Sequence, residues 1–244
     1  MDRLIYTAMS GANNLMRRQE TLANNLANAN TTGFRAETVA LRAVPARGAE
    51  AGTRVYTVET TIGNDLTPGP MLSTGRDLDV ALQGSGWLAV QASDGSEAYT
   101  RAGNLQVSAD GVLQLPNGLS VLGDGGPITL PQNAFISVGG DGTISARLAG
   151  QSTTNQVSRL KLVNPPAEDL TKGLDGLFRL KDGGEADADP NVRIASGHLE
   201  GSNVNVVDAM IGMIAAARQF ELQLKMLDNA QQNEQKANSL LGTS

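Results

Sequence analysis

Residues 5–34 of the chain read IYTAMSGANNLMRRQETLANNLANANTTGF. Apolar residues recur in this stretch at alternating spacings of three and four, which places them along one side of a helix. The seam that they form has one polar member, Gln19, and consists of Ile5, Ala8, Ala12, Leu15, Gln19, Leu22, Leu26 and Ala29. The pattern predicts an amphipathic helix that depends on a partner, because such helices are marginal in water unless their apolar side is buried.

The C-terminal end of the chain carries the same spacing. Its seam is apolar at first and mostly polar towards the end, and it consists of Val206, Met210, Met213, Ala217, Phe220, Leu224, Leu227, Gln231, Glu234, Asn238 and Leu241. We therefore predict that the N- and C-terminal helices pair as a coiled coil, within one chain, between chains or both. The alternative is that both helices cover one face of a central sheet, as in many α+β domains.

The N-terminal helix is expected to stop at residues 31–33, where Gly33 can adopt the left-handed conformation that closes a helix. The turns before it contain the amides of Asn24, Asn25, Asn28 and Asn30. Asparagine is a mediocre helix former, so amide hydrogen bonds between packed helices would be one compensation. A frayed and solvated helix end explains the same residues equally well.

The middle of the chain has the pattern of β-structure. Residues 36–79 mix Thr, Gly, Pro and charges without a sustained period and read as an extended linker with a few short strands. A firm break is expected at Thr67-Pro68-Gly69-Pro70. Short strands separated by turns follow, and we expect them at 87–91, 98–101, 105–107, 112–115, 119–122, 134–138, 142–146, 159–163, 177–180 and 193–195. Asp-Gly pairs between them favour turns over calcium sites, because the pairs lack a fixed spacing.

The expected fold class is α+β, with N- and C-terminal helices that pair as a coiled coil, a central antiparallel β-domain and an extended linker. The predicted domains are the N-terminal helix of an inner helical module (1–33), the linker (34–79), the β-domain (80–200) and the C-terminal helix of the helical module (201–244).

Composition excludes several classes of function. Lys and Arg number 19 against 25 Asp and Glu, which argues against nucleic acid as a partner because phosphate binding relies on cationic side chains. The chain has no cysteine, hence no disulfide framework and no thiol nucleophile. No run approaches the roughly 18 apolar residues that span a bilayer, so we expect no direct membrane insertion. A cleavable signal peptide is not expected either, because Gly11, Asn13 and Asn14 interrupt the apolar start.

Catalytic and metal-binding patterns are weak. His198 is the only histidine, so neither a two-histidine metal site nor a relay between histidines can form. Asp77 and Asp79 would share one face of a strand, but no second catalytic element accompanies them. Ion pairs with Arg76 or Arg101, or turn capping, explain these carboxylates better. We predict no enzyme activity, no cofactor and no metal.

Three segments resemble one known family. Residues 22–35 (LANNLANANTTGFR) resemble the N-terminal signature shared by bacterial flagellar rod and hook proteins. Residues 199–205 (LEGSNVN) and 213–221 (MIAAARQFE) are similar to the C-terminal signature of this family, and residues 77–84 (DLDVALQG) with 99–104 (YTRAGN) are similar to its central motif. The three segments occur in the family's order and cover both ends and the middle of the chain.

The resemblance implies a self-assembling axial structural protein that transmits torque and surrounds the export channel. Residues 40–45 (ALRAVP), Trp87 and the modest length point to the proximal rod rather than to the distal rod or the longer hook. The implied location is the periplasmic rod of the flagellar basal body, reached without a cleavable signal peptide. The implied partners are copies of the chain itself, other proximal rod proteins, the distal rod protein and the flagellar type III export apparatus.

Assembly contacts are expected at the two ends, from apolar seam residues and from amides at the helix termini. We assign this interface to Leu15, Leu22, Asn24, Asn25, Leu26, Asn28, Asn203, Asn205, Met213, Phe220, Leu224 and Leu227. Besides a distal rod protein, the alternative is an extracellular binding module with a coiled-coil stalk, although an aromatic content of 3% counts against glycan stacking. An enzyme of unusual chemistry is disfavoured by the thin inventory of ionisable groups.

Overall fold

A computed structural model of the chain describes residues 2–45, 55–148, 150 and 153–241. The chain divides into two compact units: unit 1 is Met1–Ala29, Ala36–Asp65 and Val204–Ser244, and unit 2 is Asn30–Arg35 and Leu66–Asn203. The N-terminal part of the chain thus enters unit 2 briefly, returns to unit 1 and enters unit 2 again. Each unit is described separately below.

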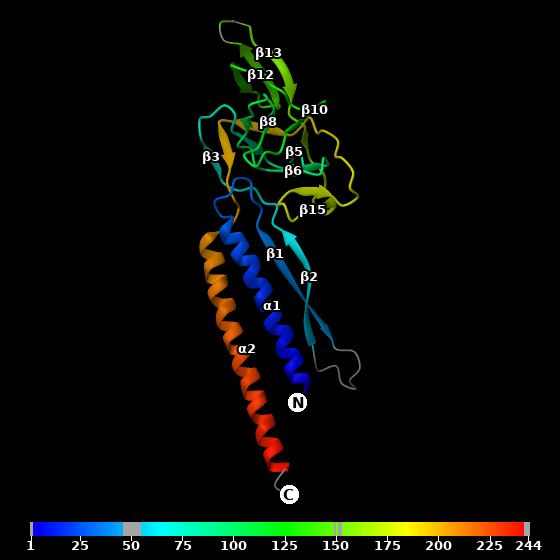
Figure 1. Cartoon of the computed structure of the whole chain (residues 1–244), viewed down its shortest axis with the longest axis vertical. Helices are drawn as coiled ribbons and strands as arrows, with labels where there is room; N and C mark the ends of the chain where they lie inside the picture. The colour runs from blue at the N-terminus through cyan, green and yellow to red at the C-terminus, as the bar shows by residue number, and fades with distance from the viewer. Residues whose placement is uncertain (1, 46–54, 149, 151–152, 242–244) are drawn as a thin grey trace. The chain divides into compact units, whose positions relative to one another are not determined.

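Unit 1 contains two helices and a β-hairpin (Figure 1). Helix α1 (Asp2–Ala27) and helix α2 (Val206–Leu241) lie side by side and run in opposite directions. Small residues allow the two helices to approach closely. A Cβ atom at Gly11 would lie 2.4 Å from Nε2 of Gln223, and one at Gly212 would lie 3.1 Å from Cδ1 of Leu22.

The predicted coiled coil is wrong. The described part of the chain has two α-helices, and the residues of α2 that are buried beside α1 include two alanines, Ala209 and Ala216. Three members of the predicted seam, Val206, Met210 and Leu224, are exposed by 37%, 48% and 46%. The buried side of α2 therefore coincides with the predicted seam only in part, because close approach between the helices favours small residues such as Ala209 and Ala216 over large apolar ones.

The predicted extended linker is also wrong, because two of its segments form the long strands of one hairpin. Strands β1 (Glu37–Pro45) and β2 (Val55–Asn64) pair antiparallel, and both contact α1. The register shifts between Ala40 and Leu41. Such a bulge interrupts the alternation of side chains between the two faces, which explains why no sustained period of two is visible in this segment.

Unit 2 is built from short antiparallel strands. Its main sheets are the five-stranded sheet β14-β5-β6-β16-β15 and the three-stranded sheet β11-β12-β13. The strands are β3 (Met71–Ser73), β4 (Val80–Gln83), β5 (Trp87–Gln91), β6 (Glu97–Thr100), β7 (Gln106–Val107), β8 (Leu113–Gln114), β9 (Leu122–Gly123), β10 (Gly126–Pro127), β11 (Ala134–Val138), β12 (Thr143–Leu148), β13 (Asn155–Arg159), β14 (Leu162–Val163), β15 (Leu170–Lys172), β16 (Phe178–Leu180), β17 (Arg193–Ser196) and β18 (His198–Glu200). A 3-10 turn, η1 (Ala167–Asp169), precedes β15.

Strand β5 has a continuous apolar sequence because both faces of its sheet are buried. Leu88 and Val90 belong to one apolar cluster, and Trp87 and Ala89 belong to the other. Tyr99 on the neighbouring strand β6 joins the second cluster. The two clusters form the core of unit 2, and they fix the position of β6 and of the loop that follows it.

Most of the Asp-Gly pairs form turns. Gly95, Gly142 and Gly176 have φ of 83°, 86° and 80°, and the preceding aspartates accept hydrogen bonds from backbone N–H groups two residues further on. This is the geometry of an Asx turn. The hydrogen bond with Ser96 lowers the pKa of Asp94, and the one with Thr143 lowers the pKa of Asp141.

Candidate functional site

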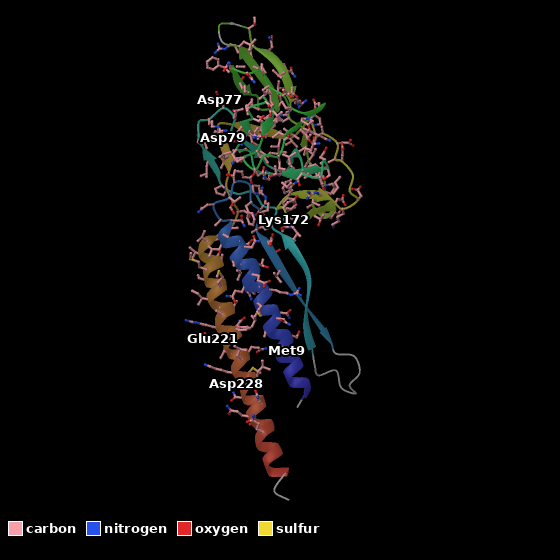
Figure 2. The ribbon with its side chains drawn as sticks, in the orientation of Figure 1. Met9, Asp77, Asp79, Lys172, Glu221 and Asp228 are labelled. Atoms are coloured by element: carbon pink, nitrogen blue, oxygen red, sulfur yellow. The ribbon has the colours of Figure 1, made fainter. Side chains whose placement is uncertain are left out.

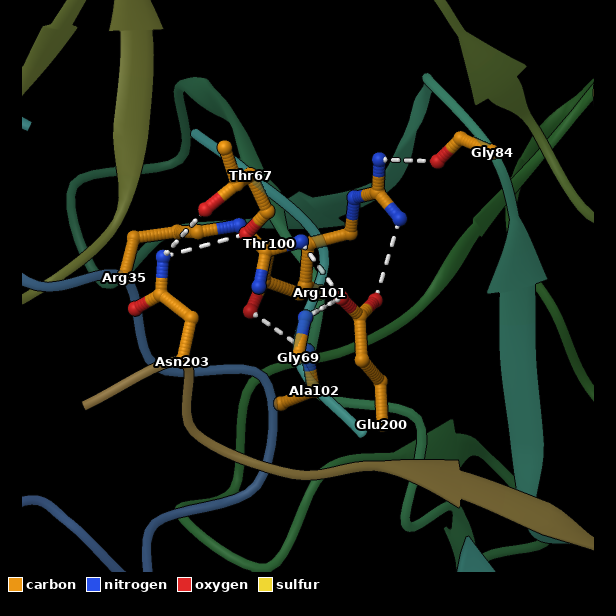
Figure 3. Close-up of polar contacts among 9 residues, drawn as sticks. All are labelled: Arg35, Thr67, Gly69, Gly84, Thr100, Arg101, Ala102, Glu200 and Asn203. Atoms are coloured by element: carbon orange, nitrogen blue, oxygen red, sulfur yellow. Dashed lines mark hydrogen bonds and ion pairs between the residues drawn. The ribbon is translucent and has the colours of Figure 1, made fainter. Parts of the chain in front are cut away.

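A buried cluster of charges joins distant parts of unit 2 (Figure 3). Nη2 of Arg35 lies 2.6 Å from Oε1 of Glu200, and Nη1 of Arg101 lies 3.0 Å from Oε2 of the same carboxylate. These three side chains are at most 3% exposed. One carboxylate thus neutralises only one of two buried guanidinium groups, and polar groups of the backbone must stabilise the remaining charge.

Backbone atoms complete part of this cluster. The carbonyl oxygen of Gly84 accepts a hydrogen bond of 2.7 Å from Nη2 of Arg101, and the N–H of Gly69 donates one of 2.9 Å to Glu200. The guanidinium of Arg101 also lies 5.5 Å from the ring centre of Trp87. Burial lowers the pKa of Arg101, whereas the charge of Glu200 opposes that effect.

The cluster brings together the three segments that carry the family resemblance. Arg35 ends the first segment, Glu200 belongs to the last, and Arg101 and Gly84 belong to the central one. The backbone supports the same arrangement, since the N–H of Gly33 donates a 2.8 Å hydrogen bond to the carbonyl of Glu200. These segments therefore have a role within one chain, which is to hold unit 2 together where its terminal segments meet.

The amides predicted for assembly have partners within the chain. Asn25, on α1, is buried and forms two hydrogen bonds of 2.8 Å with the backbone N–H and C=O of Glu37. Nδ2 of Asn28 donates to Asn24. In unit 2, Asn203 donates to the carbonyl of Thr67, and in unit 1 Oδ1 of Asn205 accepts from residues 207 and 208 as the N-cap of α2.

Replacing Asn25 with alanine is expected to destabilise unit 1 by about 1–3 kcal/mol, because the backbone of Glu37 loses two hydrogen bonds in a partly buried position. Urea unfolding of the purified chain, followed by far-UV circular dichroism, would measure the loss. Asn24→Ala is the matched control, with an expected change below about 0.5 kcal/mol at this exposed site. Equal losses for the two variants would show that the contact with Glu37 is unimportant.

The apolar residues of the predicted interface lie on both helices, and most of them are partly buried. Six of them are partly buried, and these are Leu15, Leu22, Leu26, Met213, Phe220 and Leu227. Leu224, the seventh, is 46% exposed. Met9 and Met16 on α1 are also exposed, and Figure 2 marks Met9.

The first turns of α2 carry an exposed apolar stripe, of which the predicted seam contained only Met210. Val207, Met210, Ile211 and Ile214 are exposed by 62%, 48%, 60% and 56%. Their spacing of three and four residues places them on one face, roughly opposite to the buried Ala209 and Ala216. Helix α2 thus has two apolar faces, and the sequence already contained this signal in the near-continuous apolar run over residues 206–217.

The candidate catalytic residues do not form a site. Asp79 pairs with Arg76 at 3.6 Å, Asp77 is exposed, and Figure 2 marks both aspartates. Arg101, the other cation proposed for these carboxylates, contacts Glu200 instead. Nδ1 of His198 lies 2.9 Å from the carbonyl oxygen of Ser196. Within the described residues, no group of three or more His, Cys, Asp or Glu side chains could hold a metal ion, and no helix is long and apolar enough to cross a membrane.

Comparisons with known proteins agree with the resemblance. Three family models match: "Flagella basal body rod protein" over residues 5–35, "Flagellar hook protein FlgE/F/G D1 domain" over residues 81–146, and "Flagellar basal body rod FlgEFG protein C-terminal" over residues 195–240. The flagellar basal-body rod protein FlgF of Salmonella typhimurium is 49% identical, with 100% of both chains covered. FlgF of Caulobacter vibrioides is 36% identical over 99% of both chains. FlgG of Agrobacterium fabrum, another basal-body rod protein, is 33% identical, with 93% of this chain and 95% of FlgG covered.

Proposed function

The chain belongs to the flagellar basal-body rod protein family, and from this premise we propose which of its surfaces builds the rod. It is a structural component of the flagellar basal body, related over its full length to proteins named FlgF, and it is not an enzyme. Membership in the family implies assembly with other rod components. We propose that the main assembly surface is the exposed stripe of α2, formed by Val207, Met210, Ile211 and Ile214.

The exposure of this stripe in the single chain carries the proposal. Contiguous exposed apolar surface is uncommon on soluble monomers, and it usually marks an interaction site. Full burial of a Val, Ile or Met side chain contributes about 1.5–3 kcal/mol relative to exposure. Four such residues in register along one helix face can therefore contribute several kcal/mol for each subunit that joins the rod, before the entropic cost of association is subtracted.

Most of the other apolar residues of the predicted interface are half-buried within unit 1 and do not belong to the exposed stripe. Leu15, Leu22 and Leu26 of α1 are half-buried in unit 1, as are Met213, Phe220 and Leu227 of α2. Leu224 is a separate exposed apolar residue further along α2. The amides of Asn24, Asn28 and Asn205 make hydrogen bonds at the ends of the helices, Asn25 binds the backbone of Glu37, and Asn203 binds the carbonyl of Thr67. Their direct contact with neighbouring subunits stays a prediction.

The position within the flagellum is also part of the proposal. Full-length identity of 49% to a protein named FlgF supports the proximal rod. There the neighbours would be copies of the chain, other proximal rod proteins and the distal rod protein, around the channel through which the type III apparatus exports subunits. Close-packed helices resist changes in volume, which suits a periplasmic shaft that transmits torque.

Replacing Ile214 with aspartate is expected to abolish incorporation into the rod, because an unpaired carboxylate would be buried in the interface. The monomer should keep its fold, since Ile214 is 56% exposed there. The measurement is complementation of a strain that lacks the gene, scored by swimming and by immunoblots of purified basal bodies. Leu224→Asp should behave in the same way.

Gln219→Asp provides a matched control, since it introduces the same charge on α2 at an exposed polar position away from the stripe. Rods with normal amounts of Gln219→Asp protein and without Ile214→Asp protein would support the assignment. Normal incorporation of Ile214→Asp would refute it. Circular dichroism of each purified variant would separate failure of assembly from failure of folding.

A further inference from the structure

The tight turn after β8 in unit 2 (Figure 1) carries the only asparagine of the sequence that a glycine follows, Asn117-Gly118. The N–H of Gly118 donates a 2.9 Å hydrogen bond to the carbonyl oxygen of Leu115, and the N–H of Leu115 donates one of 2.9 Å to the carbonyl oxygen of Leu119. Gly118 has φ of 85°. These two bonds and a left-handed glycine are typical of a three-residue hairpin loop.

The turn is open to solvent, and nothing shields its glycine. Pro116, Asn117 and Gly118 are exposed, and no atom lies within 4 Å of the place that a Cβ atom on Gly118 would occupy. An asparagine side chain loses ammonia when the backbone nitrogen of the next residue attacks its amide carbon. A side chain on that next residue hinders the attack, and glycine, which has no Cβ atom, removes the hindrance.

The side chain of Asn117 is folded over the peptide group that would react. Its Oδ1 accepts a 3.3 Å hydrogen bond from the N–H of Leu119, which is the geometry of an Asx turn. The amide carbon Cγ is therefore held near the backbone nitrogen of Gly118, and such positioning lowers the barrier to a reaction between two groups. The N–H of Gly118 must first leave the carbonyl of Leu115, but opening one hydrogen bond at an exposed loop tip costs little.

We propose that Asn117 is a site of spontaneous deamidation in the folded protein. The backbone nitrogen of Gly118 gives its proton to solvent and bonds to Cγ of Asn117, the bond between Cγ and Nδ2 breaks, and Nδ2 takes up a proton and leaves as ammonia. The succinimide ring that results then consumes one water molecule. Hydrolysis of its bond between Cγ and the Gly118 nitrogen gives aspartate, and hydrolysis of the original peptide bond gives isoaspartate.

Each product changes the turn in a defined way. Aspartate adds a negative charge at the loop tip, whereas isoaspartate lengthens the main chain by one carbon atom between Leu115 and Leu119. Leu115 is 2% exposed and Val121 is fully buried, so the residues on both sides of the turn should stay anchored in the core while the turn changes. The amount of product then records the time since the chain folded. The proposal concerns unit 2 alone, so it does not depend on the assembly surface of α2.

The test is to incubate the purified full-length chain in neutral buffer at growth temperature and to follow its tryptic peptides by mass spectrometry. Trypsin cleaves after Arg101 and Arg147, so a single peptide, residues 102–147, contains the site together with Asn133. Asn133 is also exposed, but alanine follows it, which makes it a control within the same peptide. Fragmentation should locate the conversion of amide to carboxyl at Asn117, at least about tenfold faster than at Asn133, or about 1.4 kcal/mol in activation free energy.

Two variants and an unfolded sample separate the effect of the fold from that of the sequence. Asn117→Gln should lose the conversion at this position, because the longer side chain must close a larger and less favourable ring. Asn155→Gln, at an exposed position elsewhere on unit 2, should leave the conversion at Asn117 unchanged. A parallel sample in concentrated urea gives the rate for the unfolded chain. The proposal is overturned if Asn117 of the folded chain does not react, if it reacts no faster than Asn133, or if only the sample in urea reacts.

Discussion

Glu200→Gln is expected to lower the free energy of unfolding of unit 2 by about 3–5 kcal/mol, the usual cost of removing one partner from a buried ion pair. The cost is large here because the same carboxylate serves both Arg35 and Arg101, and all three side chains are at most 3% exposed. Glutamine preserves the shape of the side chain and removes its charge. Two buried guanidinium groups would then lack a counterion. Urea unfolding monitored by the fluorescence of Trp87, which packs near Arg101, would measure the change.

Glu168→Gln is the control for this prediction. It removes the same charge at an exposed site of unit 2, where the change should be within about 0.5 kcal/mol. A second comparison tests the coupling itself. Arg101→Met should cost less in the Glu200→Gln background than in the wild type, by about 1–3 kcal/mol, because contacting charges are not additive. Additive losses would mean that the cluster does not act as a unit.

The buried charge cluster also shows where sequence reasoning ends. Glu200 is 165 residues from Arg35 and 99 residues from Arg101 along the chain. Charged residues normally lie at the surface, so nothing in the local pattern separates these three from solvated ones. The resemblance of the segments around them identified a family, yet it did not indicate that the segments meet each other within one chain.

The regular strands were predictable for the opposite reason, since their signals are local. The apolar run 87–91 and the alternating run 134–138 coincide with β5 and β11, because turn residues bound both of them. The hairpin β1–β2 was missed where a bulge at Ala40 and Leu41 breaks the alternation. The side of α2 that packs against α1 was predicted wrongly, because the prediction relied on the spacing of large apolar residues. Small residues such as Gly212 and Ala216, which permit the close approach of the two helices, were not considered.

The left-handed conformation predicted for Gly33 is confirmed, with φ of 69°, but it serves a different purpose. Helix α1 already ends at Ala27, and Gly33 instead lies against the backbone after β6. A Cβ atom at Gly33 would lie 2.3 Å from the carbonyl carbon of Arg101 and 2.4 Å from the backbone nitrogen of Ala102. The absence of a side chain therefore lets the segment that carries Arg35 reach the buried cluster.

Gly33→Ala is accordingly expected to destabilise unit 2 by about 3 kcal/mol or more, as the sum of two effects. The left-handed conformation costs a residue with a Cβ atom about 1–2 kcal/mol, and the clash with backbone atoms of residues 101 and 102 adds to it, because no side-chain rotation can relieve it. Gly75→Ala separates the two effects. Gly75 has almost the same φ, 70°, but nothing lies within 4 Å of a Cβ atom there.

Urea unfolding of both glycine variants and the wild type would therefore measure the steric contribution as a difference. A loss of about 1–2 kcal/mol for Gly75→Ala, with a clearly larger loss for Gly33→Ala, would establish that close packing of the N-terminal segment against residues 101 and 102 holds Arg35 at Glu200. Equal losses would mean that the segment can move away from this loop at little cost. In that case the ion pair between Arg35 and Glu200, rather than the close backbone contact, would have to hold the N-terminal segment in unit 2.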